Sequence, residues 1–428
     1  AEQAGGWGPG GTAVIVGDMW DRHWCAGATA RVAELAPRMN DFLREARRRG
    51  MVIIHAPSDT MNFYAAAPQR RHALAVERGA PPAAINDWKA LNTAKEPPLP
   101  IDDSDGGCDD EPQCQQGRAW TSQIAVIELG ADDYLSDRGD EIYSILRKHG
   151  VRHVVILGVH TNMCVLGRSF SLRQMVSLGF DTVLVRALPD TMSNSRRRPF
   201  VNHFAGTDLV VEHIEKYWCP SVTSADLLGG EAFRFAADRR KRVAFLVGED
   251  EYRTWETLPA FAASELAGRG YELRWITAPP GGGQDFANVT ALADADLVVV
   301  SVRRRAPRAE LLSALREHLA AGRPVVGLRT ASHAFAPRGE VPPGHAAWPA
   351  FDVEVLGTRY EGHFSNRAAE GDPTRVRFTA GGAAHPVLTG LPAEGFASAT
   401  TLYRSRELAP GVTPLLVGTC REIGRAHV

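Results

Sequence analysis

The sequence lacks several features that would assign it to a class of protein directly. No apolar run approaches the length of a membrane-spanning helix, so we expect a soluble protein with no membrane partner. The 48 lysines and arginines nearly balance the 50 aspartates and glutamates. The formal net charge of -2 therefore gives no electrostatic reason to expect nucleic acid as a partner. No signal-like apolar stretch is visible near the start. A cytoplasmic protein and an exported one that has lost its signal both stay open.

Cysteine is also scarce. Six cysteines are too few for a disulfide scaffold in 428 residues: Cys25, Cys108, Cys114, Cys164, Cys219 and Cys420. Cys108 and Cys114 fall in one loop, where they could pair with each other or bind a metal together with Cys25. Neither a CxxC pair nor a spaced histidine pair supports that metal site. We therefore expect unpaired cysteines or one local bridge, without a metal or another cofactor.

The length predicts two domains, because 428 residues exceed the usual size of one. The composition is typical of a globular protein, with 44% hydrophobic and 23% charged residues. Residues 233–242 are charged and poor in apolar side chains, which places a linker there. We expect one domain over residues 1–235 and another over 236–421. Residues 422–428 break the preceding pattern and read as a translated adapter, so we expect a non-native tail and a missing true C-terminus.

The most informative stretch ends in Cys164. Residues 154–157 form a continuous apolar run, typical of a parallel strand buried on both faces. A turn follows, and a pattern with helical spacing begins at Cys164. This order places a thiol at the carboxyl end of a sheet, where open α/β folds bind ligands. The N-terminus of the following helix favours the thiolate over the thiol. A buried structural cysteine is the alternative, since free cysteine is among the most buried residue types.

The other apolar runs predict the fold class. Residues 12–16 read as a further buried strand, with Asp18 just past its end. Strands are also predicted over residues 51–55, 124–127, 182–185 and 208–211, and a long amphipathic helix over 28–49. Strands that alternate with helices predict an α/β protein. We expect two three-layer α/β/α domains, each with a mainly parallel, doubly wound sheet.

Two segments carry a resemblance to a known family. Residues 16–20 (VGDMW) and 158–165 (GVHTNMCV) together resemble the isochorismatase-like cysteine hydrolases, which have an aspartate after the first strand and a GVxTNxCV turn with the nucleophile. The likeness extends from residue 12 to about residue 230. It implies that Cys164 attacks a carbonyl or similar electrophilic carbon, while Asp18 takes and returns the proton. It also implies a homo-oligomer.

The same resemblance implies how the turn would bind a developing negative charge. Members of the family usually have a non-proline cis peptide just before the nucleophile turn, which here falls between Val159 and His160. It would direct the backbone N–H groups of His160 and Cys164 toward one point, as an oxyanion hole.

One member of the family's catalytic triad is missing. The family places a lysine after the strand that precedes the nucleophile strand, and residues 122–130 contain none. Glu128 falls close to the expected position, and a second carboxylate near the thiol would raise its pKa. The nearest lysines are Lys89, Lys95 and Lys148. Either an arginine or lysine reaches the site from elsewhere, or the chemistry has changed, or the site only binds.

Further polar and aromatic side chains are expected to line the substrate pocket: Trp20, His23, His55, Gln123, Glu128 and Asn162. In nicotinamidase-type relatives an aspartate and histidines near the second strand hold a metal. The tight Asp-x-His pair is absent among His55, Asp59 and His72, so we expect no metal there. Residues 79–120 hold many prolines and acids, including Asp103 and Asp110, without EF-hand spacing. We expect a solvated acidic loop that forms a lid or an oligomer contact.

The second half carries a different resemblance. Residues 327–335 (GLRTASHAF) and 356–363 (LGTRYEGH) resemble the ThuA-like (trehalose utilisation) branch of the class I glutamine amidotransferase fold. Amidotransferases have a nucleophilic cysteine at the first of these turns, where this chain has Arg329, Thr330 and Ser332. Glutamine hydrolysis is therefore not expected. The pocket candidates of this domain are Glu249, Arg329, His333 and His363, with Asp250 and Glu251 beside them.

These observations favour a hydrolase that cleaves an amide-like C–N bond of a small molecule through Cys164. Two alternatives stay open. The chain could be a degenerate ligand-binding protein, because each half has lost a residue typical of the enzymes it resembles. It could also act on a carbohydrate derivative through the ThuA-like half.

Overall fold

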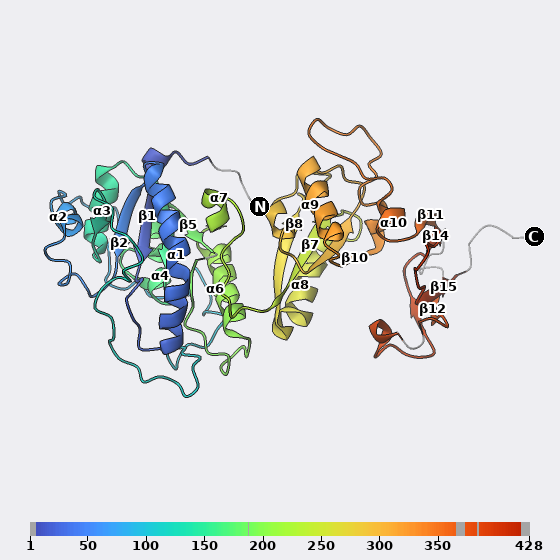
Figure 1. Ribbon diagram of the computed structural model, residues 1–428, viewed down its shortest axis with the longest axis horizontal. Coiled ribbons are helices and arrows are strands. Elements are labelled where there is room, and N and C mark those ends of the chain that lie inside the picture. Colours follow the sequence, from blue (N-terminus) through green and yellow to red (C-terminus); the bar gives the residue numbers. More distant parts are fainter. Residues whose placement is uncertain (1–5, 187, 365–372, 383–384, 421–428) are drawn as a thin grey trace, which may run out of the picture. The chain divides into compact units, whose positions relative to one another are not determined.

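The computed structural model describes residues 6–186, 188–364, 373–382 and 385–420, so the suspected non-native tail lies outside the described residues. The chain divides into two compact units (Figure 1). The N-terminal unit holds the described residues up to Arg240 together with Ala263–Glu272. The C-terminal unit holds Lys241–Ala262 and the described residues from Leu273 onward. Within the described residues, no helix is both long enough and apolar enough to span a membrane.

The N-terminal unit is built on a six-stranded sheet in the order β3-β2-β1-β4-β5-β6, in which all neighbouring pairs run parallel. The strands are β1 (Thr12–Gly17), β2 (Val52–Ala56), β3 (Tyr134–Leu135), β4 (His153–Gly158), β5 (Asp181–Val185) and β6 (Ser221–Val222). The helices are α1 (Ala26–Arg48), α2 (Pro68–Leu74), α3 (Gly139–Lys148), α4 (Cys164–Gly167), α5 (Leu172–Ser177), α6 (His203–Tyr217) and α7 (Ser224–Leu228). The predicted α/β class is confirmed.

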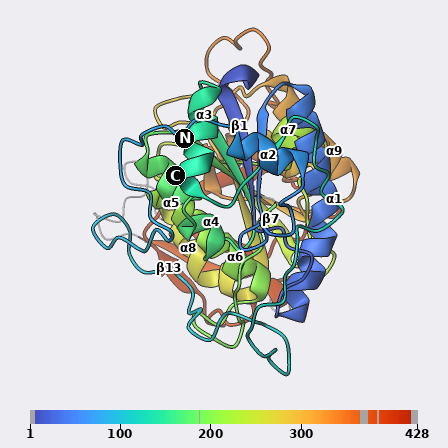
Figure 2. The ribbon, with the colours of Figure 1, turned by 90° about the vertical axis from the view of Figure 1, so that its left-hand side faces the viewer.

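Alternation of side chains along the strands produces the three layers. Val14 and Val16 of β1 pack on one face with the apolar stripe of α1. Ala13 and Ile15 point to the other face and pack with residues of α3, α5 and α6. Figure 2 shows α1 and the α4–α5 pair on opposite sides of β1. Both faces of the sheet are therefore covered, which explains why its strands are continuously apolar in sequence.

Two predicted strands are wrong. Residues 124–127 form a turn, in which the Ile127 N–H donates to the Ile124 carbonyl at 3.1 Å. Ile124 and Ile127 pack against the α1 face of the core without pairing with a strand. Residues 208–211 lie inside α6, which begins after Asn202, whose side chain accepts from the Ala205 N–H. Val210 and Ile214, four positions apart, are both buried, which is the spacing of one face of a helix. A short apolar run does not distinguish this helical spacing from a strand.

The connection from α2 to β3 is anchored through its acids. Glu96 is buried and forms an ion pair with Arg173 of α5 at 2.7 Å, and it also contacts the His213 ring of α6 at 2.8 Å. The Asn162 amide donates to Asp103 at 2.7 Å, and the Asp109 carboxylate accepts from the Ser195 backbone at 2.8 Å. The expectation of a solvated acidic loop is therefore wrong for these residues. They fix the connection to the folded unit.

Replacing Glu96 by glutamine should lower the free energy of unfolding by about 3–5 kcal/mol, because it leaves the buried Arg173 without its counter-charge. Burial alone would raise the pKa of Glu96, but the pairs with Arg173 and His213 hold it below its usual range. The stabilisation should therefore be present above the unfolded-state pKa of about 4.3 and disappear as the pH falls through the folded-state value. Denaturant unfolding at pH 7 and pH 3 measures both effects. Glu77→Gln, at an exposed position, is the control; equal losses in the two variants would contradict the anchoring role.

The C-terminal unit contains a four-stranded sheet in the order β10-β9-β7-β8, in which β9 runs parallel to both β7 and β10. Its strands and helices are β7 (Lys241–Gly248), α8 (Thr254–Glu265), β8 (Tyr271–Thr277), β9 (Leu297–Val302), α9 (Ala309–Ala320), β10 (Val325–Gly327) and α10 (Phe351–Glu354). Two antiparallel groups follow, made of β11 (Arg359–His363) with β14 (Tyr403–Arg406), and of β12 (Thr374–Phe378) with β13 (Phe396–Ser398) and β15 (Leu416–Thr419). The last three residues of α8 and the first two residues of β8 belong to the N-terminal unit. The other residues of both elements belong to the C-terminal unit.

Candidate functional site

The strand order of the N-terminal unit fixes where a ligand site is expected. The chain goes from β1 outward to β2 and β3, and then returns to β4 on the other side of β1. In open parallel sheets a crevice forms at this reversal, beyond the carboxyl ends of the two central strands. Those strands are β1 and β4, paired in register up to Gly17 and Gly158. Asp18 follows the first and the turn to Cys164 follows the second.

Glycine is required where these two strands end. Gly158 has φ +128°, and a Cβ on it would lie 2.0 Å from the Gly17 carbonyl oxygen. Any larger residue would push the two strands apart. The close approach keeps the Asp18 turn and the Cys164 turn side by side.

Asp18 is fully buried and has a left-handed backbone, with φ +50°. One carboxylate oxygen accepts the Ser58 backbone N–H at 2.6 Å, and the other accepts Nε of Arg168 at 3.2 Å. The Cys164 thiol lies close enough to this carboxylate for each group to shift the pKa of the other. Asp18 therefore contacts both a thiol and a cation inside the crevice.

Arg168 places a positive charge beside Asp18, although residues 122–130 contain no lysine. It lies four positions after Cys164, directly beyond the single turn of α4, and its guanidinium contacts both Asp18 and the Cys164 sulfur. It also reaches Asp59 at 3.5 Å. Two of the three lysines considered from the sequence have other partners: Lys95 lies over the Trp218 ring and Lys148 over the Tyr134 ring. An arginine thus reaches Asp18 from outside the expected segment.

The ionisation of this group differs from what the helix position predicted. Burial raises the pKa of the Cys164 thiol, and the charge of Asp18 raises it further, while Arg168 opposes both. Burial also raises the pKa of Asp18, against the opposing effects of Arg168 and Cys164. The helix α4 is only four residues long, so its N-terminus cannot outweigh the desolvation of the sulfur. Burial and Asp18 therefore oppose the thiolate that a helix N-terminus favours.

The backbone of the nucleophile turn has the predicted form. The peptide bond between Val159 and His160 is cis. Among the described residues, the backbone N–H groups of His160 and Cys164 donate to no carbonyl, whereas their neighbours Thr161, Met163 and Val165 do. The N–H groups of His160 and Cys164 are thus among those of the turn that are left for another acceptor.

Aromatic rings pack beside the turn. Trp20 stacks on Trp120 with ring centroids 4.2 Å apart, and His23 lies at the edge of His160, with centroids 4.7 Å apart. Burial lowers the pKa of His160 to about 3 and that of His23 to about 4. Both imidazoles are therefore neutral near pH 7. Trp88, from the α2–β3 connection, lies against Gly167 and under the guanidinium of Arg168.

The remaining predicted pocket residues have partners of their own. His55 is fully buried between Gln123, at 3.1 Å, and Asp133, at 3.0 Å. The Asn162 amide accepts the Met192 N–H at 2.9 Å and donates to the Met192 carbonyl at 3.2 Å. Both side chains are held by structural hydrogen bonds.

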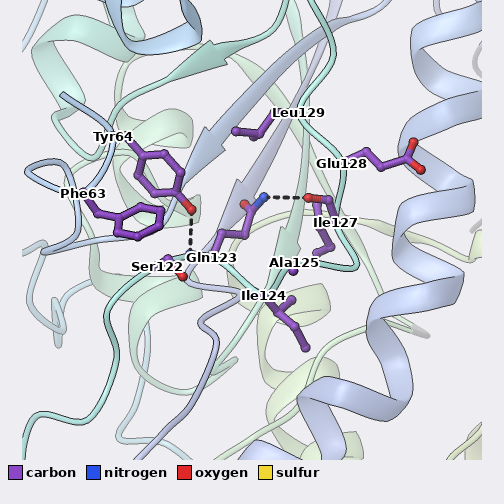
Figure 3. Close-up of a pocket in the computed structure, with 9 residues that line it drawn as sticks. All are labelled: Phe63, Tyr64, Ser122, Gln123, Ile124, Ala125, Ile127, Glu128 and Leu129. Carbon is purple, nitrogen blue, oxygen red and sulfur yellow. Dashed lines mark hydrogen bonds between the residues drawn. The ribbon is translucent and has the colours of Figure 1, made fainter. Parts of the chain in front are cut away.

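Gln123 and Glu128 line a separate pocket of about 370 Å³ around residues 122–129 (Figure 3). Tyr64 Oη accepts the Gln123 N–H at 2.9 Å on its wall. Figure 3 shows the Glu128 side chain pointing toward α1, where it pairs with Arg44. The Glu128 carboxylate, which was expected near the Cys164 thiol, therefore points toward α1 instead. Neither Asp18 nor Cys164 lines this pocket.

In the C-terminal unit, three of the four predicted pocket residues come together. Arg329, His333 and His363 line a small pocket of about 80 Å³, to which Arg303, Arg304 and Arg338 add positive charge. Burial and the nearby arginines lower the pKa of His333 to about 4. Glu249 has a different role, because its carboxylate accepts the backbone N–H groups at residues 251, 252 and 254, where α8 begins.

Solved structures similar to this chain fall into two groups. A cysteine hydrolase from Pseudomonas syringae pv. phaseolicola 1448A is 16% identical, with 52% of this chain and 93% of that chain covered, and a TM-score of 0.33. An isochorismatase family protein from Desulfovibrio vulgaris subsp. vulgaris str. Hildenborough is 16% identical, with 51% and 99% covered, and a TM-score of 0.31. A putative ThuA-like protein from Bacteroides uniformis ATCC 8492 is 19% identical, with 44% and 71% covered, and a TM-score of 0.31. No family model and no curated protein matches the sequence.

Proposed function

We propose that the N-terminal unit is a hydrolase that cleaves an amide-like C–N bond of a small molecule through Cys164. The observation that carries the proposal is the ion pair of Arg168 with Asp18, which lies beside the Cys164 thiol at the carboxyl ends of β1 and β4. A thiol beside a carboxylate and a fixed cation is the set of groups needed for nucleophilic catalysis with proton transfer. The resemblance of both segments to cysteine hydrolases supports the same reaction class.

The raised pKa values suit a nucleophile that is activated only when it attacks. Arg168 carries one positive charge, so it balances one negative charge on the Asp18–Cys164 pair, and the pair keeps one proton between them. As Cys164 attacks the carbonyl carbon, its proton passes to Asp18. The oxygen of the tetrahedral intermediate then accepts the backbone N–H groups of His160 and Cys164.

The second half of the reaction returns the proton. Protonated Asp18 donates to the leaving nitrogen as the C–N bond breaks, which leaves an acyl thioester on Cys164 and frees the amine. Asp18 then takes a proton from water, whose oxygen attacks the thioester carbon. Cys164 leaves as a thiolate, which Arg168 stabilises until Asp18 returns the proton. A guanidinium stays protonated throughout, so Arg168 acts by its charge and does not transfer a proton.

A screen of small amides, followed by amine release, tests the proposal. Cys164→Ala should lower turnover of any amide that the wild type hydrolyses by about 10⁴–10⁶-fold. Cys164 in the wild type should also carry a substrate-derived acyl group, visible by mass spectrometry after rapid acid quench. Cys219→Ala, which removes a buried thiol far along the chain at the end of α6, is the control and should leave turnover unchanged. Amides that bind without turnover, equally to wild type and Cys164→Ala, would instead favour a ligand-binding protein.

A further inference from the structure

Three cysteines and one carboxylate converge at the start of α1. Cys25 immediately precedes this helix, while Cys108, Asp110 and Cys114 come from the α2–β3 connection, with Cys108 lying 83 positions after Cys25. The ligand atoms of Cys25, Cys108 and Asp110 all lie within 4.8 Å of one another. The group is separate from Cys164 and plays no part in the reaction proposed above.

The distances within this cluster match those expected around one small cation. Oδ2 of Asp110 lies 3.4 Å from the sulfur of Cys25, 3.6 Å from that of Cys108 and 3.2 Å from that of Cys114. In a tetrahedral zinc site with Zn–S bonds of about 2.3 Å and a Zn–O bond of about 2.1 Å, the oxygen lies about 3.6 Å from each sulfur. The three measured distances fall close to that value. The Asp110 oxygen therefore lies about as far from each sulfur as in such a site, although the sulfurs of Cys25 and Cys108 are only 2.8 Å apart.

The surroundings support ionised sulfurs. The sulfurs of Cys25 and Cys114 lie near backbone N–H groups at the N-terminal end of the 23-residue helix α1. The Asp110 carboxylate accepts the Gly27 N–H at 2.8 Å. A Cβ on Gly27 would lie 2.5 Å from its other oxygen, so only glycine leaves room for it. Backbone N–H groups of this kind fix the orientation of metal ligands.

Without a cation the cluster is electrostatically unfavourable. The sulfurs of Cys25 and Cys108 lie 2.8 Å apart, and the Asp110 carboxylate lies 3.4 Å and 3.6 Å from them. Met192 and the partly buried Trp24 and Met163 pack around the sulfurs and limit the access of water. A divalent cation would offset the repulsion among these groups, because it stabilises the thiolates and the carboxylate together.

We propose that Cys25, Cys108, Cys114 and Asp110 bind one structural zinc ion that clamps the α2–β3 connection to the start of α1. Three thiolates favour zinc over the harder cations calcium and magnesium, and four protein ligands leave no open position for catalysis. The sulfurs of Cys25 and Cys108, now 2.8 Å apart, would separate by about 1 Å to reach tetrahedral spacing. Because the clamp closes a long segment of chain, zinc should stabilise the N-terminal unit.

Metal content of the full chain, purified under reducing conditions and reconstituted with Zn²⁺, tests this site. We expect about one zinc per chain in the wild type and in the control Cys219→Ser. Cys25→Ser and Cys108→Ser should retain less than about a tenth of it, and Asp110→Asn should bind at least tenfold more weakly. Reconstitution with Co²⁺ should produce sulfur-to-cobalt charge-transfer absorption that weakens in Cys114→Ser.

A second measurement covers variants that fail to fold. Alkylation of the wild type, mapped by mass spectrometry, should slow at Cys25, Cys108 and Cys114 when Zn²⁺ is added and recover with a chelator, while Cys219 is unaffected. The rival is a disulfide between Cys25 and Cys108. Reconstituted wild type without zinc, or a Cys25–Cys108 disulfide that persists under the purification conditions, would overturn the proposal.

Discussion

Asp18→Asn should make Cys164 react faster with iodoacetamide at neutral pH while it lowers amide turnover by about 10²–10⁴-fold. The charge of Asp18 and its hydrogen bond both raise the pKa of the Cys164 thiol. Asparagine removes that charge, so the thiolate becomes the only anion beside Arg168, and the pKa of the thiol falls. The same substitution removes the group that accepts and returns the proton. A more reactive thiol in a less active enzyme is the expected combination.

Alkylation rates against pH, read at Cys164 by mass spectrometry, measure the first effect, and amine release measures the second. The wild-type alkylation curve should lie at higher pH than that of Asp18→Asn. Asp21→Asn is the matched control, because Asp21 lies three positions further on and bonds to Thr121 and Ser122 at the surface. Its curve should follow the wild type. Slower alkylation in Asp18→Asn, or unchanged turnover, would show that Asp18 neither opposes the thiolate nor carries the proton.

The parts of the site that follow from strand order could be predicted from sequence. Continuous apolar runs marked β1 and β4; Asp18 comes directly after β1, and the turn to Cys164 comes directly after β4. Parallel neighbours end at the same edge of the sheet, so Asp18 and Cys164 had to meet once those strands paired. The cis bond before His160 followed from the resemblance of the turn.

Arg168 could not be recognised in the same way, because the family pattern directed attention to the strand before the nucleophile. A signal was nevertheless present: residues four apart share one face of a helix, so a cation at i+4 lies beside a cysteine at i. The misassigned segment, residues 124–127, shows the opposite failure. Ile124 and Ile127 pack against the core as side chains of a strand would, but they reach it from a turn in which Val126 is exposed.

The zinc-site candidate lies further beyond sequence reasoning. The three cysteines have no spacing that marks a metal site, and Cys25 is 83 positions from Cys108. Only the path of the α2–β3 connection brings them together, and that connection contains no regular element whose periodicity could be read. A local sequence pattern does not show which irregular segments, distant along the chain, lie together in the folded protein.

Arg168→Met should lower amide turnover by about 10²–10³-fold, whereas Arg168→Lys should stay within about tenfold of the wild type, because a cation is what the site requires. Arg168 lowers the pKa of both Asp18 and Cys164 against the effect of burial. Its loss raises both values. Asp18 must be ionised to accept the proton, so the acidic limb of the pH–rate profile should move to higher pH in Arg168→Met. Alkylation of Cys164 should also require higher pH.

The Lys variant separates a charge effect from simple damage to the fold. Lysine keeps the cation while it loses the planar fork that reaches two partners, so Arg168→Lys should restore the wild-type position of both pH curves even where its turnover is reduced. Arg44→Met, which breaks the exposed pair with Glu128, is the control and should change neither curve. If Arg168→Met kept the wild-type acidic limb, the cation would not set the ionisation of Asp18, and the role assigned to Arg168 would be wrong.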